Sequence, residues 1–184
     1  MLSALKTPSH EAAVENVNIS SQVYINQELP AQTFINVVFS YLNFVNTVAD
    51  TQTYIDTKFQ RIKSVGASFK ADISNCEFDY FTAIDTIYNV KQKNFVQNHI
   101  LYDGLNFTKK SKHIDGTYDN LNSVDTRWPR NIFENIVFTN ADFIRTSFYG
   151  ATFKNVSFID CNFYKVGFGK ATFNNVYMNR SNYN

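Results

Sequence analysis

The chain has 184 residues and a formal net charge of +1, which suits one domain or two small ones. A near-neutral charge gives no field that would draw the whole molecule to nucleic acid, so we expect no nucleic-acid partner. Two cysteines exclude a disulfide scaffold, and 6 glycines with 3 prolines exclude a collagen-like chain.

Residues 1–12 are predicted to be a loose leader that precedes the repeats, and the N-terminal residues lack the apolar centre of a signal peptide. Elsewhere no apolar run approaches the roughly 20 residues that a membrane helix needs. We therefore expect a soluble protein with no membrane span in this chain.

Residues 13–88 show a degenerate five-residue period of apolar side chains, which is clearer from Phe34 onward. After Phe69 the period slips by one residue and resumes at Ile73, as a bulge at a corner would produce. Degenerate repeat coils are predicted for this segment.

From residue 89 to residue 130 the period is lost, and an irregular insertion or capping segment is predicted. Turns are expected at Asp103-Gly104 and Asp115-Gly116. Trp128 is predicted either to cap the open end of the repeats that follow or to be buried at a corner. One continuous β-helix with an insertion and two short β-helices (20–88 and 105–184) both fit; we favour the continuous body.

The last segment, 131–184, has a strict five-residue period. The period is carried by Phe133, Phe138, Phe143, Phe148, Phe153, Phe158, Phe163, Phe168 and Phe173, and continues at Met178 and Tyr183. Mostly small residues, including Cys161, stand two positions before these; Cys76 occupies the same slot earlier, so both thiols are predicted to be buried. Neither an α-helix, of period 3.6, nor a strand, of period 2, places such residues on one face. A coil that turns a corner every five residues directs every ring to one axis.

Three units in this segment, Ala141-Asp142-Phe143-Ile144-Arg145, Ala151-Thr152-Phe153-Lys154-Asn155 and Ala171-Thr172-Phe173-Asn174-Asn175, resemble pentapeptide repeats. The resemblance implies an all-β fold, a right-handed quadrilateral β-helix with roughly 20 residues per coil. It implies little about chemistry, because one fold hosts many functions.

A second resemblance is to the luminal loop of the synaptic vesicle glycoprotein family, a pentapeptide β-helix that botulinum neurotoxins bind. The similar stretches are 44–59, Asn106-Phe107-Thr108 and 153–163. This resemblance implies an extracellular or luminal location; without it a cytoplasmic one is expected. That family flanks the loop with membrane helices, which this sequence lacks, so no receptor site is carried over.

Catalytic and metal-binding patterns are missing from the sequence. His10, His99 and His113 are the only histidines, and none lies at metal-ligand spacing from a cysteine or another histidine. We predict no cofactor, no metal and no enzymatic activity. The competing hypothesis is an enzyme whose site in the middle segment uses His99, Asp103 and His113.

Four Asn-x-Ser/Thr sequons, Asn18, Asn106, Asn155 and Asn179, are candidate glycosylation sites. Asn106 is the preferred acceptor because it lies outside the regular repeats. The alternative is that these asparagines simply line polar faces.

The expected function is a non-catalytic module that binds another protein by the walls or the open end of the β-helix. An open strand edge near the C-terminus can pair with a partner or with a second copy, and Tyr177, Arg180 and Tyr183 are the candidate contacts. A DNA-mimicking protein acting on DNA gyrase is the alternative. It is disfavoured because residues 131–184 carry three acids and five bases, a net +2.

Overall fold

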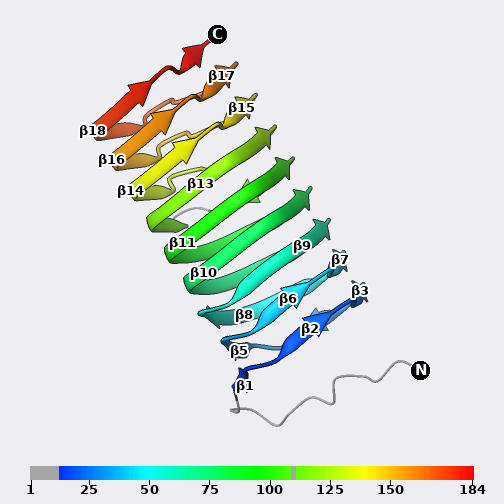
Figure 1. Ribbon diagram of the computed structural model, residues 1–184. Helices are drawn as coiled ribbons and strands as arrows, with labels where there is room; N and C mark the ends of the chain where they lie inside the picture. Colours follow the sequence, from blue (N-terminus) through cyan, green and yellow to red (C-terminus); the bar gives the residue numbers. More distant parts are fainter. Residues whose placement is uncertain (1–12, 109–110) are drawn as a thin grey trace.

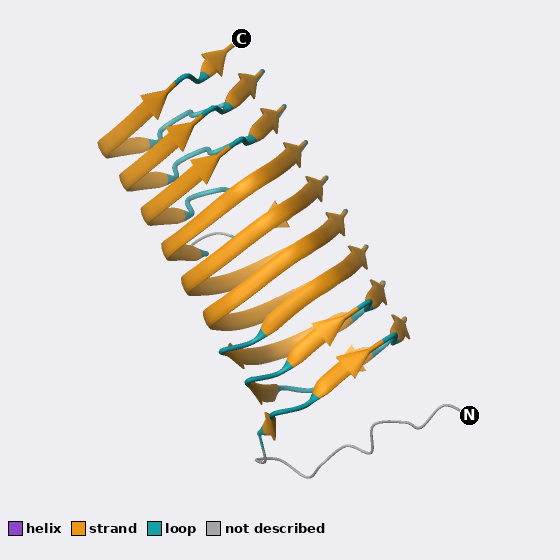
Figure 2. Cartoon of the chain, viewed as in Figure 1, coloured by secondary structure: helices purple, strands orange, loops and turns teal. Residues whose placement is uncertain are grey.

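The computed structural model describes residues 13–108 and 111–184, with the side chains of 50 and 51 excepted, so the predicted leader (1–12) lies outside the described residues. All regular secondary structure in that part of the chain is β-strand (Figure 2). The strands are β1 (Val14–Glu15), β2 (Asn18–Ser20), β3 (Val23–Ile25), β4 (Glu28–Leu29), β5 (Gln32–Ile35), β6 (Val38–Ser40), β7 (Asn43–Val45), β8 (Val48–Ile55), β9 (Lys58–Val65), β10 (Ser68–Ile84), β11 (Ile87–Asp103), β12 (Asn106–Phe107), β13 (Lys112–Val124), β14 (Ile132–Thr139), β15 (Asp142–Ile144), β16 (Thr152–Ile159), β17 (Asn162–Tyr164), β18 (Thr172–Asn179) and β19 (Asn182–Tyr183).

The strands wind into one continuous right-handed, four-sided β-helix, as predicted (Figure 1). Each strand pairs in parallel with the strand one coil away, and all 19 belong to one sheet. Phe133, Phe153 and Phe173 are successive partners on one side, so residues 20 apart in sequence lie directly above one another.

Corners explain the polar positions of the repeat. In the regular coils the residue two places after an inward ring adopts a left-handed backbone, with φ near 50°, and is most often Asn or Asp, which tolerate that conformation. Along one corner these side chains also form a ladder: the Asn175 amide donates to Asn155 Oδ1, and the Asn155 amide to Asn135 Oδ1, both at 2.9 Å.

The interior of the C-terminal half is filled by stacked rings. The ring centroids of Phe133 and Phe153 lie 5.1 Å apart with an interplanar angle of 8°, and those of Phe138 and Phe158 lie 5.0 Å apart at 4°. Such pairs add roughly 0.5–1.5 kcal/mol each beyond area burial. Cys76 and Cys161 are buried free thiols, as predicted, and burial raises the pKa of each to about 11.

The structure differs from the prediction of an irregular segment at 89–130. β11 follows β10 in constant register from Ser68↔Ile87 to Ile84↔Asp103, and β13 pairs with β11 in turn. The inward positions of these coils hold Gln92, Gln97, Tyr102 and His113, so no single residue type marks them.

Corner lengths also vary in this part of the chain. A register shift between Phe69 and Ala71 confirms the predicted bulge. Gly104 adopts φ 62° at a corner, as the predicted turn requires. At the second predicted turn Asp115 takes the corner conformation, with φ 53°, and Gly116 is the buried residue that follows it within β13. A Cβ at Gly116 would lie 2.4 Å from Phe95 Cε1, so this glycine makes room for the ring of the coil below.

Trp128 is not a cap. Its side chain is fully buried within the stack, 3.7 Å from the Phe107 ring and 6.0 Å from the Phe148 ring by centroid. The expectation of a cap is wrong because the coils continue on both sides of it. No helix in the described chain is long and apolar enough to cross a membrane.

Candidate interaction surface at the C-terminal end

The last coil leaves one strand edge free at the C-terminal end (Figure 1). β18 pairs with β16, and β19 pairs with β17; within the described strands neither has a partner on its other side. Backbone groups along this edge are therefore available to pair with a strand of another chain.

The same end uncovers the core. Phe173, Met178 and Tyr183 are the last members of three inward columns, and their exposed fractions are 46%, 50% and 67%. One coil earlier the matching residues, Phe153, Phe158 and Phe163, are at most 1% exposed. In the described structure Phe173, Met178 and Tyr183 form an apolar platform at this end of the stack.

The three predicted contacts take different positions around this platform. The Tyr183 hydroxyl donates to the Val166 carbonyl at 3.2 Å, which holds the side chain at the end of the stack. Tyr177 is 59% exposed on the outer wall, and Arg180 occupies the next corner. Sequence reasoning missed Phe173 and Met178. Both could have been found by asking which inward residue is the last of its 20-residue series in the sequence.

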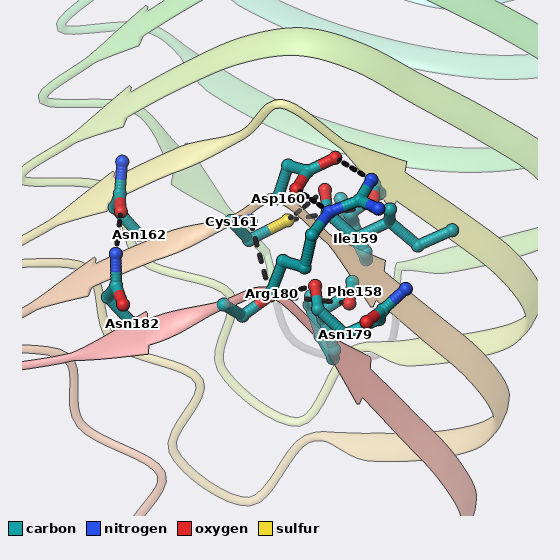
Figure 3. Close-up of polar contacts among 10 residues, drawn as sticks. Phe158, Ile159, Asp160, Cys161, Asn162, Asn179, Arg180 and Asn182 are labelled. Carbon is teal, nitrogen blue, oxygen red and sulfur yellow. Dashed lines mark hydrogen bonds and ion pairs between the residues drawn. The ribbon is translucent and has the colours of Figure 1, made fainter.

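Polar contacts hold the last coil to the one before it (Figure 3). Arg180 donates to both carboxylate oxygens of Asp160 at 2.6 Å. The hydrogen bonds lower the pKa of Asp160 and raise the pKa of Arg180. Ser181 accepts from the Cys161 backbone at 3.2 Å, and the Asn182 amide donates to Asn162 Oδ1 at 3.2 Å. The platform is a bonded coil and not a frayed terminus.

The four sequons lie in different environments. Asn18 and Asn106 are exposed on β2 and β12, and Asn179 is half-buried. Asn155 belongs to the corner ladder, where its side chain both donates and accepts. A glycan on Asn155 would remove its donated bond to Asn135. Asn106 does not lie outside the coils, as the prediction assumed, because it pairs with Ile87 and Arg127 in β12.

The residues of the competing enzyme hypothesis do not converge. His99 is at an outer corner, where its ring stacks on Tyr80 and Nδ1 lies 3.1 Å from Asp79 Oδ1, whereas His113 is completely buried in the core. Within the described residues, no group of three or more His, Cys, Asp or Glu could hold a metal ion. His10 lies outside those residues.

Space inside the coil is small. The interior cavity in the N-terminal half measures about 70 Å³ and is bordered mainly by rings such as Phe59, Phe78 and Tyr88. Ligand pockets usually measure about 300–1,000 Å³. The interior of the coil is therefore too small for a typical ligand pocket.

Comparison with known proteins agrees with this architecture. Residues 132–182 match the family model for pentapeptide repeats, in 9 copies. The C-terminal segment is therefore built of pentapeptide repeats, and the predicted resemblance to that family is confirmed. No curated protein matches the sequence.

Solved structures share the fold at low sequence identity. A trypsin-treated variant of QnrB1, a plasmid-mediated fluoroquinolone resistance protein, is 13% identical, with a TM-score of 0.59 over 90% of this chain and 82% of that chain. A second trypsin-treated QnrB1 variant is 12% identical, with a TM-score of 0.55 over 89% of this chain and 83% of that chain. HetL, a pentapeptide repeat protein from the cyanobacterium Nostoc sp. that is involved in heterocyst differentiation regulation, is 11% identical. The match covers 88% of this chain and 87% of that chain, with a TM-score of 0.45.

Proposed function

We propose that this protein is a non-catalytic interaction module that binds another protein through the walls or the open end of its β-helix. The observation that carries the proposal is the uncovered core at the last coil, where Phe173, Met178 and Tyr183 stand exposed beside a free strand edge. Large exposed apolar side chains grouped on a firmly held surface are typical of protein interfaces.

A second copy of the chain fits the same end. Two identical ends can meet about a two-fold axis, because each then offers the same apolar platform and edge to the other. Tyr177 and Arg180 lie beside the platform and would contribute the rim of either kind of interface, whereas Tyr183 belongs to the platform itself.

The test pairs a change at the end with a matched change on the wall. Met178→Lys alters a side chain that is 50% exposed at the end, and Val96→Lys alters one that is 48% exposed on β11. Light scattering after size exclusion measures self-association, and a pull-down from native material measures partner capture. We expect Met178→Lys alone to reduce either signal; equal behaviour of the two variants would count against the end as the binding surface.

The second candidate is a DNA mimic acting on DNA gyrase, favoured by the fold shared with a fluoroquinolone resistance protein. The charge opposes it, because residues 131–184 carry a net +2, whereas a DNA mimic needs an acidic wall. A gyrase supercoiling assay decides: inhibition near stoichiometric protein would favour this candidate over the interaction module.

The resemblance to the luminal loop of synaptic vesicle glycoproteins remains a prediction about location. Mass spectrometry of the native protein tests it, since a glycan at Asn106 would require passage through a secretory compartment.

A further inference from the structure

A shallow hollow of about 290 Å³ interrupts one outer wall in the middle of the coil. It crosses four adjacent strands, β8, β10, β11 and β13. Its outward-facing lining residues are Thr53, Ile55, Asp72, Ser74, Lys91, Lys93, Lys112 and Ile114.

The hollow lies where two coils have a short corner. Trp128 and Asn131, successive inward positions in a regular coil, are separated by two residues, but one residue separates Phe69 from Ala71, and one separates Tyr88 from Val90. The next coil places three residues between Phe107 and Ser111. Two tightened coils therefore lie between longer ones, which accounts for a wall that is recessed at β10 and β11.

Three lysines gather in this recess beside a single acid, Asp72. Lys91 lies 3.6 Å from Asp72 on one side and is the direct cross-strand partner of Lys112 on the other. Lys112 then faces Ile132, so no acid stands beside it in the ladder.

Lys93 likewise has no acid opposite it. It is paired across the strands with Ser74 and Ile114, neither of which carries a charge. In the described chain no ion pair neutralises Lys93 or Lys112.

Some lysines elsewhere on the walls are paired with acids of the neighbouring coil, whereas others, such as Lys63 between Asn43 and Thr82, face uncharged residues. Lys58 contacts Glu77 at 3.0 Å, and Lys154 contacts Glu134. Like charges directly opposite each other in a sheet are destabilising, so the Lys91–Lys112 pair is an unfavourable contact that an anion in the recess would relieve.

Aliphatic side chains mark the two ends of the recess. Ile55 stands on β8 and Ile114 on β13, three strand spacings apart, which is about 14 Å. An extended segment of about five residues spans that distance.

We propose that this hollow binds an acidic, extended segment of a partner protein, with carboxylates over Lys91, Lys93 and Lys112 and an apolar side chain near each isoleucine. The proposal rests on the interaction-module function and names a partner class for one wall. Single-stranded nucleic acid fits less well, because it uses aromatic platforms for its bases and the lining residues of the hollow include none.

The probe is a fluorescein-labelled peptide of sequence Leu-Glu-Asp-Glu-Leu. Its binding to the protein is measured by fluorescence polarisation. The neutral isostere Leu-Gln-Asn-Gln-Leu and a labelled five-nucleotide single strand are the comparison ligands. Lys112→Glu tests the recess, and Lys154→Glu, on the same wall beside Glu134, is the charge-matched control.

We expect the acidic peptide to bind, the neutral peptide not to bind, and Lys112→Glu to weaken binding at least tenfold while Lys154→Glu changes it less than twofold. Binding should also weaken between 50 and 200 mM salt. An equal loss in both variants, no binding of the acidic peptide, or tighter binding of the oligonucleotide would overturn the proposal.

Failure here is distinguishable from failure of the proposed function. Met178→Lys should leave peptide binding unchanged, because it alters the far end of the coil. If Met178→Lys still abolishes partner capture while the acidic peptide never binds, the interaction module stands and the hollow is excluded as its site.

Discussion

Acid should weaken this protein through one buried histidine. His113 is 0% exposed, its ring stacks on Phe133 at 4.9 Å, and Trp128 lies 5.3 Å away by ring centroid. Nε2 donates to Asn131 Oδ1 at 3.2 Å, and the Tyr118 hydroxyl lies 2.8 Å from Nδ1. Burial lowers the pKa of His113 from 6.5 to about 3, opposed in part by the bond to Asn131.

The sign follows from proton uptake. Because the folded pKa lies below the unfolded pKa of 6.5, the unfolded state binds more protons at every pH between them, so stability falls as the pH drops through that window. At pH 5.0 the unfolded imidazole is mostly protonated and the folded one is neutral. The loss between pH 7.5 and pH 5.0 is about 2 kcal/mol, at about 1.4 kcal/mol per pH unit.

Urea unfolding at pH 7.5 and 5.0, followed by the fluorescence of the single tryptophan, Trp128, measures this loss next to the histidine itself. His113→Phe should remove most of the pH dependence, even though it leaves Asn131 Oδ1 without its donor. His99→Gln, at an exposed corner, should retain it. A wild-type free energy of unfolding that is flat or rises toward pH 5.0 would refute the assignment of a neutral, desolvated imidazole.

Three further predictions concern the packing and the corners. Phe153→Asp should abolish cooperative thermal unfolding, because an unpaired charge among stacked rings costs several kcal/mol, whereas the outward Lys154→Asp should stay within about 1 kcal/mol; equal effects would mean that the inward and outward faces are misassigned. Gly116→Ala should lower the free energy of unfolding by about 1–3 kcal/mol, because the added methyl group overpacks against Phe95. Adding Phe95→Leu should recover part of this loss. Strictly additive losses of the two substitutions in denaturant unfolding would contradict the contact. Asn155→Ala should cost about 1–2 kcal/mol, since it breaks two ladder bonds at a φ of 54°, and Asn155→Gly less; a comparable loss in exposed Asn174→Ala would exclude the ladder as the cause.

The five-residue period determined the fold of the C-terminal third. Every fifth residue from Phe133 to Phe173 is phenylalanine, so the side that each residue faces can be read from sequence alone. The buried thiols and the bulge after Phe69 followed from the same period.

The middle coils could not be read in this way. Core partners there lie 19 to 21 residues apart and compensate each other in size, as Phe95 and Gly116 do, so neither position keeps a fixed type. His113 and Trp128 became core residues only through neighbours in the adjacent coils.

Both proposed surfaces were likewise decided by the tertiary structure. Phe173, Met178 and Tyr183 are exposed although their sequence context matches that of the fully buried rings one coil earlier, so the five-residue period alone does not reveal the platform. The lysine recess depends on the short corners after Phe69 and Tyr88 and on the longer corner after Phe107, and the longer corner gives the 21-residue spacing that places Lys112 opposite Lys91. The local sequence sets which way a side chain points, whereas the stacking of distant coils decides what lies beside it.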